Sequence, residues 1–270
     1  MTISKTLADR KLPMDGFELA YGEFGQGRPL VLVHGFCGSS AYWRLTAPEL
    51  ARHFRVITPD LRGHGASGLP QNGGCSMEEL AGDLARLIEK LALDRPIVLG
   101  HSLGGYAALA LAETRSGVLG GFGLVHSTAL PDSPEAQANR DRGIARIRGE
   151  GLRPYVEELV PKLFAPEHRE SMADTVREMI EAGWATNPEG AVRTLEGMKR
   201  RPDRSAVLRE AAVPVLLVAG ERDAVVPPER TFVADGPHIR AVRLAKAGHM
   251  GMLETPDELV AAIRSFAEGV

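Results

Sequence analysis

Short, continuous apolar runs recur along the chain and alternate with helix-like segments. Such runs are typical of strands that are buried on both faces of a parallel sheet. The helix-like segments between them can supply the crossovers that parallel strands require. The sequence therefore predicts an α/β fold, in which a mostly parallel central sheet is flanked by helices. The runs read PLVLVHG, FRVITPD, PIVLGHS, GGFGLVHS, VPVLLVAGERD and IRAVRLAKAGH.

Local signals at the two ends of the chain complete this interpretation. Residues 17–25, FELAYGEFG, alternate apolar with polar side chains and predict an early antiparallel strand. The spacing of apolar residues predicts a helix over Met77–Ala92, with Ser76 as its N-cap. Thr255 is expected to cap a last helix that has Pro256 at its first position.

One block breaks the alternation of apolar runs and helices. From about residue 128 to about residue 204 the sequence is charged and helix-like, and it contains no strand-like run. We interpret this block as a helical cap inserted over the C-terminal edge of the sheet, where open parallel sheets bind ligands. The predicted core domain then comprises residues 1–127 and 205–270, and the cap comprises residues 128–204.

A serine stands between glycines at the end of one apolar run, in the pattern G-x-S-x-G at residues 100–104. This pattern holds a serine on a sharp turn between a strand and a helix, where bulkier neighbours would collide. A short glycine pattern can also arise by chance in an ordinary turn. Its position between IVL and an alanine-rich helix is the one the motif requires, so we predict that Ser102 is a nucleophile.

A serine hydroxyl needs a base, and the base needs an acid to orient it. His249 follows the last predicted strand, and Asp223 follows the strand before it. Ser102, Asp223 and His249 thus come just after the C-terminal ends of three strands, which meet at one edge of a parallel sheet. Asp94 and Asp60 are weaker alternatives for the acid, because Asp94 precedes its strand and Asp60 is better suited to holding the DLRGHG turn.

With these residues in this order, the chain resembles the α/β-hydrolase superfamily. The matching segments are HGF at residues 34–36, DLRGHGAS at 60–67, GHSLGG, GERD and AGH. The resemblance covers nearly the whole chain except the cap. It implies that the backbone N–H groups of Phe36 and Leu103 form an oxyanion hole, and it implies no metal and no organic cofactor.

Other side chains near these motifs have more ordinary interpretations. We expect His126 to line the pocket and contact the substrate, while His34 and His101 serve the scaffold. Cys37 is expected to be a small packed side chain and not a second nucleophile. The arginines of residues 140–153 could bind an anionic substrate, although a solvated helix face is the commoner explanation.

The predicted function is that of a serine hydrolase acting on carboxylic esters with small to medium acyl chains. Lactone hydrolysis, carbon–carbon bond hydrolysis and removal of an N-terminal proline stay open, the last requiring acidic cap residues such as Glu157 or Glu158. A small-molecule receptor that retains the triad is an alternative from a different class. Dehalogenases and epoxide hydrolases are excluded, because they use an aspartate nucleophile.

Composition narrows the range of partners. The net charge is −3 and the pI is near 6.3, so nothing favours nucleic acid or an anionic membrane as a partner. Two cysteines are too few for a disulfide framework, and no Cys/His cluster indicates zinc. The N-terminal stretch indicates no signal peptide, and no segment has the roughly 18 apolar residues of a membrane span. We expect a cytoplasmic monomer or homodimer that acts on a small-molecule ester.

Overall fold

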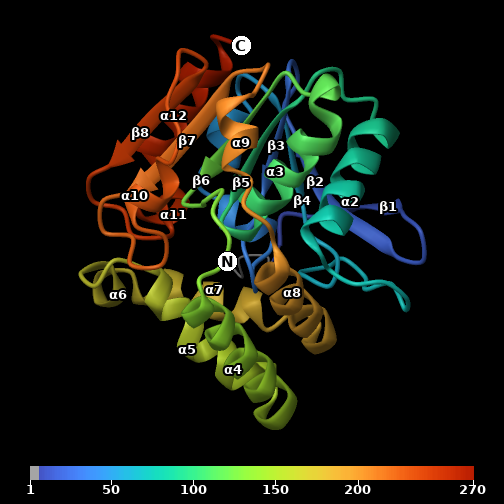
Figure 1. The fold of residues 1–270 in the computed structure, drawn as a ribbon, viewed down its shortest axis with the longest axis vertical. Helices are drawn as coiled ribbons and strands as arrows, with labels where there is room; N and C mark the ends of the chain where they lie inside the picture. Colours follow the sequence, from blue (N-terminus) through green and yellow to red (C-terminus); the bar gives the residue numbers. More distant parts are fainter. Residues whose placement is uncertain (1–5) are drawn as a thin grey trace.

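A computed structural model describes residues 6–270 as an eight-stranded sheet with helices on both faces and at one end (Figure 1). The strand order is β1-β2-β4-β3-β5-β6-β7-β8. The β1–β2 and β2–β4 pairs are antiparallel, and all pairs from β4 to β8 are parallel. The predicted α/β class is confirmed. Residues 1–5, which belong to the stretch without a signal-peptide pattern, lie outside the described residues.

The strands occupy the apolar runs that the sequence indicates, with one addition at the edge of the sheet. That addition is β1, a short segment without an apolar run that forms a hairpin with the adjacent strand β2. The central strand β5 lies between β3 and β6, and all of its residues are buried. The strands are β1 (Arg10–Pro13), β2 (Glu18–Phe24), β3 (Pro29–Val33), β4 (Arg55–Pro59), β5 (Ile97–His101), β6 (Gly121–Val125), β7 (Val215–Gly220) and β8 (Ile239–Leu244).

The helices connect these strands or follow them. None of the helices in residues 6–270 is long and apolar enough to cross a lipid bilayer. The helices are α1 (Ala47–Leu50), α2 (Met77–Lys90), α3 (Leu103–Arg115), α4 (Pro134–Glu150), α5 (Leu152–Leu163), α6 (His168–Ser171), α7 (Ala173–Gly183), α8 (Pro188–Arg200), α9 (Ser205–Arg209), α10 (Pro228–Thr231), α11 (Gly251–Glu254) and α12 (Pro256–Ala267), with 3₁₀ turns η1 (Ser40–Trp43) and η2 (Ser116–Val118).

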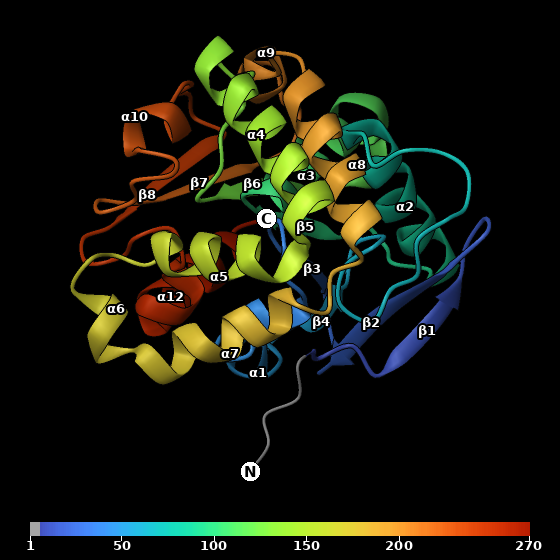
Figure 2. The same ribbon diagram turned by 90° about the horizontal axis from the view of Figure 1, so that it is seen from below.

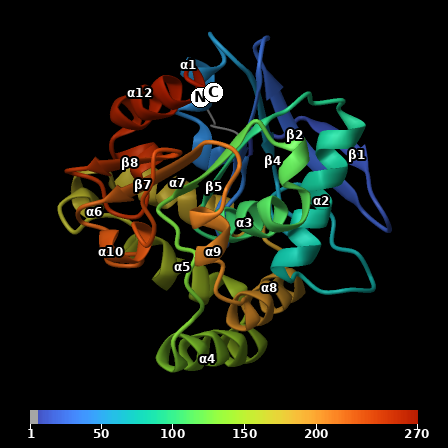
Figure 3. The ribbon, with the colours of Figure 1, turned by 45° about the horizontal axis from the view of Figure 1, so that its top comes forward.

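Both faces of the parallel sheet are covered, as buried strands require. Helices α2 and α3 pack together on one face, and α3 lies against β5 and β6. Helices α1 and α12 pack together on the opposite face, as Figures 2 and 3 show. The alanine-rich α3 is buried over nearly its whole length, because its small side chains let it approach the sheet closely.

The predicted N-cap of α2 is confirmed, whereas the predicted side-chain cap of α12 is wrong. Ser76 accepts from the backbone N–H of Glu79, and the Glu79 carboxylate accepts in return from the Ser76 N–H, a complete capping box at the start of α2. Thr255 does not cap α12 with its side chain. Its hydroxyl instead donates to the carbonyl of Gly251, and α12 begins with Pro256.

Residues 128–204, the predicted cap, contain α4 to α8 and no strand. In Figures 1 and 2 the helices α4, α5, α7 and α8 form a layer at one end of the sheet. The chain enters this layer after the C-terminal end of β6 and leaves it before α9 and β7. That the layer acts as a lid stays a prediction.

Two buried polar side chains hold the loops at this edge. The Asp60 carboxylate accepts from the backbone N–H of Ser40 at 2.7 Å and of Ala66 at 2.8 Å, so its predicted role as a loop anchor is confirmed. His34 is fully buried; its Nδ1 lies 2.7 Å from the carbonyl oxygen of Gly35, and its Nε2 accepts from the Leu61 N–H at 2.9 Å. These bonds require a neutral imidazole ring.

Burial lowers the pKa of His34 to about 4, although the bond to the Gly35 carbonyl opposes this shift. Burial and the neighbouring His34 ring lower the pKa of His64 to about 3. An unfolded histidine binds a proton near pH ~6.5. Below that pH the unfolded chain therefore holds protons that the folded protein excludes, so stability falls with falling pH.

We predict that the free energy of unfolding decreases as the pH falls from ~6.5 towards ~4, by about 3 kcal/mol for each such histidine. Urea unfolding measured across this range should show the decrease. His64→Gln should reduce the slope, whereas His53→Gln, at an exposed histidine, should leave it unchanged. A free energy that stays constant over this pH range would contradict the account.

Candidate active site

Ser102 lies on the turn between β5 and α3 with a φ of +49°, a conformation that is strained for a residue with a side chain. Its backbone is held from both sides. The Ser102 N–H donates to the Val125 carbonyl of β6 at 3.1 Å, and the Ser102 carbonyl accepts from the Ser127 hydroxyl at 2.7 Å. These bonds fix the serine at the C-terminal end of the central strand.

The glycines on either side of Ser102 are required by close backbone contacts. A Cβ atom on Gly100 would lie 2.1 Å from the carbonyl group of Gly104, and one on Gly104 would lie 2.5 Å from the carbonyl oxygen of Val33. Real Cβ atoms essentially never approach backbone that closely. The two glycines are therefore required because α3 packs tightly against β3 and β5.

His249 and Asp223 are joined by a short hydrogen bond. His249 Nδ1 lies 2.7 Å from Asp223 Oδ2, and both side chains are almost completely buried. Asp223 Oδ1 accepts from the backbone N–H groups of Val225 and Val226, each at 2.8 Å. Burial alone would raise the pKa of Asp223, but the neighbouring His249 outweighs burial, and the pKa is held well below its usual range.

The predicted nucleophile Ser102 and the predicted base His249 line one cavity of about 240 Å³, together with Phe36 of the predicted oxyanion hole and with His101. Asp223 lies behind His249, on the side away from the cavity lining. Within residues 6–270 no hydrogen bond joins the Ser102 hydroxyl to the His249 ring. Such contacts are often long in the absence of a substrate and tighten when one binds.

Two backbone N–H groups beside Ser102 have no acceptor in the described part of the chain: those of Phe36 and Leu103. Phe36 follows β3, and Leu103 is the first residue of α3, where a helix leaves its N–H groups unpaired. The partial positive charge of the helix N-terminus favours an anion at this position. Cys37, next along the chain, is fully buried, and burial raises the pKa of its thiol, as expected of a packed side chain.

His126 was expected to line the pocket, and this expectation is wrong for the structure. The ring is fully buried and is not part of the cavity lining. A φ of +50° at the end of β6 places it against β7, where Nδ1 accepts from the Gly220 N–H at 3.2 Å. The same Nδ1 lies 3.3 Å from Asp223 Oδ2. His126 thus contacts the buried acid and not the cavity.

Glu254 is a buried carboxylate that the sequence did not single out. Its Oε1 accepts from the backbone N–H groups of Gly248 and Met250, the two neighbours of the predicted catalytic histidine, at 3.0 and 2.9 Å. Its Oε2 accepts from the Ala165 N–H at 2.9 Å and lies 2.7 Å from His168 Nδ1. Glu254 therefore ties the histidine loop to the segment between α5 and α6.

Charged side chains from the cap also reach the cavity. Arg140 of the RDRG segment lines it, whereas most of the other arginines in residues 140–153 face outward. Glu157 and Glu158, the acidic groups considered for binding an amine, are exposed and do not line it. The described residues contain no group of three or more His, Cys, Asp or Glu side chains suited to holding a metal ion.

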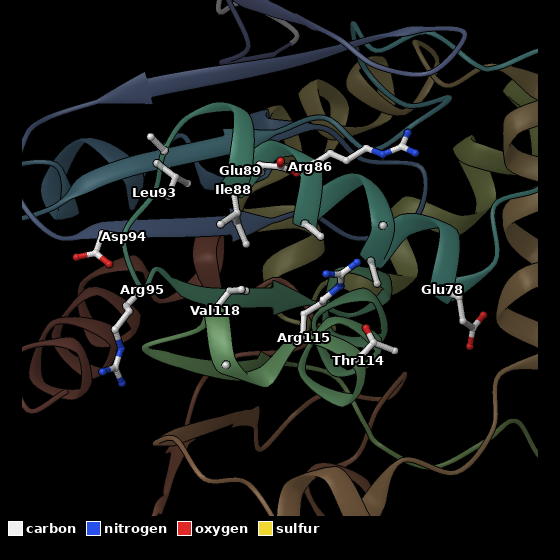
Figure 4. A pocket seen from close by; sticks show the side chains of 15 residues that line it. Glu78, Arg86, Ile88, Glu89, Leu93, Asp94, Arg95, Thr114, Arg115 and Val118 are labelled. Carbon is white, nitrogen blue, oxygen red and sulfur yellow. The ribbon is translucent and has the colours of Figure 1, made fainter.

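A wider depression of about 870 Å³ lies elsewhere, between α2, α3 and the turn before β5 (Figure 4). Its rim carries charges of both signs, including Glu89, Asp94, Arg95 and Arg115. No serine, cysteine or histidine lines it. Asp94 therefore lies away from Ser102, and the smaller cavity is the candidate site.

Comparisons with known proteins support the fold. A sequence model of the alpha/beta hydrolase family matches residues 30–262. A thermophilic esterase from Thermogutta terrifontis, solved with malate bound, is similar to this chain with a TM-score of 0.90 and 34% identity, over 96% of this chain and 98% of that one.

Two curated proteins are also similar. The pimeloyl-(acyl-carrier protein) methyl ester esterase of Aeromonas salmonicida is 30% identical over 253 residues, covering 90% of this chain and 96% of its own length. A dihydrolipoyllysine-residue acetyltransferase component of the acetoin cleaving system from Pseudomonas putida is 29% identical over 263 residues, covering 96% of this chain and 69% of its own. The names of these relatives span more than one activity.

We predict that Glu254→Gln destabilises the protein by about 2 kcal/mol, because an amide NH₂ group would face a buried N–H donor. It should also lower kcat, since the loop that carries His249 loses an anchor on both sides. Urea unfolding and steady-state kinetics measure the two effects. Glu258→Gln, at an exposed position on α12, is the matched control. An unchanged free energy of unfolding would show that the hydrogen bonds of Glu254 do not stabilise the fold.

Proposed function

The chain belongs to the alpha/beta hydrolase family, and from this premise we propose that it is a serine hydrolase of carboxylic esters with small to medium acyl chains. The observation that carries the proposal is the hydrogen bond of 2.7 Å between His249 and Asp223, beside a serine held on a strained turn. A nucleophile, a base and an orienting acid are the groups that acyl transfer requires.

In the proposed mechanism, Ser102 Oγ attacks the ester carbonyl while His249 Nε2 accepts the hydroxyl proton. Asp223 holds the ring so that Nδ1 carries a proton, and it stabilises the imidazolium that forms. The oxyanion accepts hydrogen bonds from the N–H groups of Phe36 and Leu103. His249 then returns the proton to the leaving alcohol, which leaves an acyl-Ser102 ester. Water activated by His249 hydrolyses that ester.

In this mechanism, the two free N–H groups supply the largest electrostatic stabilisation of the transition state. Loss of one such donor costs typically about 2.7–4 kcal/mol of transition-state stabilisation. They are backbone groups on Phe36 and Leu103, so they are already oriented before the reaction begins. Their lack of other acceptors in residues 6–270 supports this role.

The cavity favours small substrates. Its volume of about 240 Å³ is below the ~300–1,000 Å³ that is usual for pockets that enclose drug-sized ligands. The outward position of Glu157 and Glu158 gives no support to an amine-binding aminopeptidase. Lactones and carbon–carbon substrates could use the same groups, so they belong in the substrate panel.

The test is hydrolysis of p-nitrophenyl esters from acetate to palmitate, with a fluorophosphonate as a serine-directed inhibitor. We expect steady turnover that is greatest for short chains and is abolished by the inhibitor. A single burst of product without turnover would instead support a receptor that retains the triad. If the protein hydrolyses a lactone but none of the esters, the proposed ester substrates are wrong and lactones are the substrate class.

Ser102→Ala is expected to abolish ester hydrolysis and to leave the melting temperature nearly unchanged. The hydroxyl of Ser102 makes no hydrogen bond within residues 6–270, and alanine keeps the Cβ atom that the turn already accommodates. Thermal unfolding and ester kinetics provide the two readouts. Residual activity above about one per cent would point to another nucleophile.

Asp223→Asn is expected to lower kcat by roughly 10⁴-fold, because the amide favours the wrong tautomer of the histidine. Asp94→Asn, at the aspartate before β5, is the matched control and should leave kcat unchanged. Steady-state kinetics on the preferred p-nitrophenyl ester measure both variants. A loss of only a few-fold in Asp223→Asn would mean that another group acts as the acid.

A further inference from the structure

The cavity beside Ser102 carries more positive than negative charge. Among residues 6–270, three arginines, Arg140, Arg201 and Arg230, line it together with a single carboxylate, that of Asp132. Charged groups held away from bulk water are costly unless opposite charges accompany them. An anion that enters the cavity would therefore meet an unbalanced positive surface.

Asp132 cannot balance these arginines alone. Its Oδ1 lies 2.7 Å from Arg201 Nη1, and its Oδ2 lies 3.1 Å from Arg140 Nε. The carboxylate is almost fully buried, with 4% of its side chain exposed. One negative charge is thus shared between two guanidinium groups, and Arg230 adds a third positive charge.

Several guanidinium N–H groups at the cavity have no protein acceptor. Arg140 uses only Nε, and within residues 6–270 no hydrogen bond is made by its two terminal nitrogens. A quarter of its side chain is exposed. Arg230 has one long contact, from Nη2 to the Pro131 carbonyl at 3.4 Å. Both side chains retain donors for a ligand.

Arg201 lines the cavity beside Arg140 and is held in a fixed position by its neighbours. Only 4% of its side chain is exposed, and its guanidinium carbon lies 4.0 Å above the centre of the Tyr106 ring. Nη1 also donates to the Met198 carbonyl at 2.9 Å, but the buried Nε has no partner among the described residues. Arg201 therefore lines the cavity while one of its buried donors is left unsatisfied within residues 6–270.

The other arginines of α4 behave differently. Arg146 pairs with Glu158 of α5 on the outer surface, and Arg148 lies 3.6 Å from Glu196 of α8. These are exposed pairs that contribute little to stability. Arg140 alone among the arginines of this helix lines the cavity. The other arginines of α4 therefore lie on a solvated helix face, whereas Arg140 does not.

We propose that the substrates are small esters that carry a free carboxylate, which Arg140 binds together with Arg230 while Ser102 attacks the ester carbonyl. This inference rests on the proposed ester hydrolysis. A guanidinium group presents parallel N–H donors that match the two oxygens of a carboxylate. Half-esters of short dicarboxylic acids fit both the charge and the volume of the cavity. Their hydrolysis consumes water and releases a dicarboxylate, an alcohol and a proton.

The first experiment compares pairs of methyl esters that differ only in the terminal group. Monomethyl succinate is compared with methyl butyrate, in which a methyl group replaces the carboxylate, and monomethyl glutarate is compared with methyl valerate. Release of acid is followed by titration at constant pH. We expect kcat/KM to be about 10- to 100-fold higher for the half-esters, as the charge-assisted hydrogen bonds predict.

Arg140→Gln should lower the ratio of kcat/KM between half-ester and neutral ester by about tenfold or more. Arg230→Gln is a second, independent variant that should lower the same ratio, which keeps the test valid if Arg140→Gln folds poorly. Arg142→Gln, at an exposed arginine two residues along α4, is the matched control and should keep the wild-type ratio. A ratio near one in the wild type, or an unchanged ratio in both cavity variants, would overturn the inference.

Calorimetric titration with succinate separates this inference from the proposed function. If no ester is hydrolysed, the proposed function fails, and the carboxylate site is judged by binding alone. Succinate should then bind the wild type at least tenfold more tightly than Arg140→Gln, and butyramide, which carries no carboxylate, should bind both weakly. Equal binding of succinate by the two proteins, or no binding to either, would reject the carboxylate site.

Discussion

The close packing of α3 against the ends of β3 and β5 is the constraint on which the site depends. Gly100 and Gly104 permit this contact, since any larger residue would place a Cβ atom inside neighbouring backbone. The contact forces Ser102 into a strained conformation at the C-terminal end of the central strand. It also places Leu103 at the start of α3 beside Ser102, where its N–H group has no acceptor among the described residues. One packing constraint thus produces both the exposed serine and part of the proposed oxyanion hole.

Buried carboxylates then fix the groups around the serine. Asp223 is held by two backbone N–H groups and by its hydrogen bond with the His249 ring, so its charge is stabilised in spite of burial. Glu254 performs a similar task for the loop on either side of His249 and links that loop to the cap. Asp132 anchors two arginines at the far end of the cavity. Each carboxylate gains several donors, which compensates the cost of its burial.

The sequence predicts the fold and the order Ser102, Asp223, His249 because these features are encoded locally. Apolar runs mark buried strands, and glycine spacing marks the tight turn at the serine. The edge strand β1 could not be predicted in this way, because its four residues form no apolar run, although it pairs with the next segment of the chain. The contact between His126 and Asp223 could not be predicted either, because these residues lie far apart in the chain. The same holds for Glu254 and Arg140, because only the packed structure shows which charged side chains turn inward.

The central claim, that Ser102 forms the covalent intermediate, is tested most directly by mass spectrometry. The protein is mixed briefly with p-nitrophenyl acetate, quenched in acid and digested. The account predicts an acetyl group on the peptide that contains Ser102, and no acetylation of that peptide in protein treated first with a fluorophosphonate. Acetylation confined to another residue, such as Cys37, or turnover without any acyl-enzyme would contradict it.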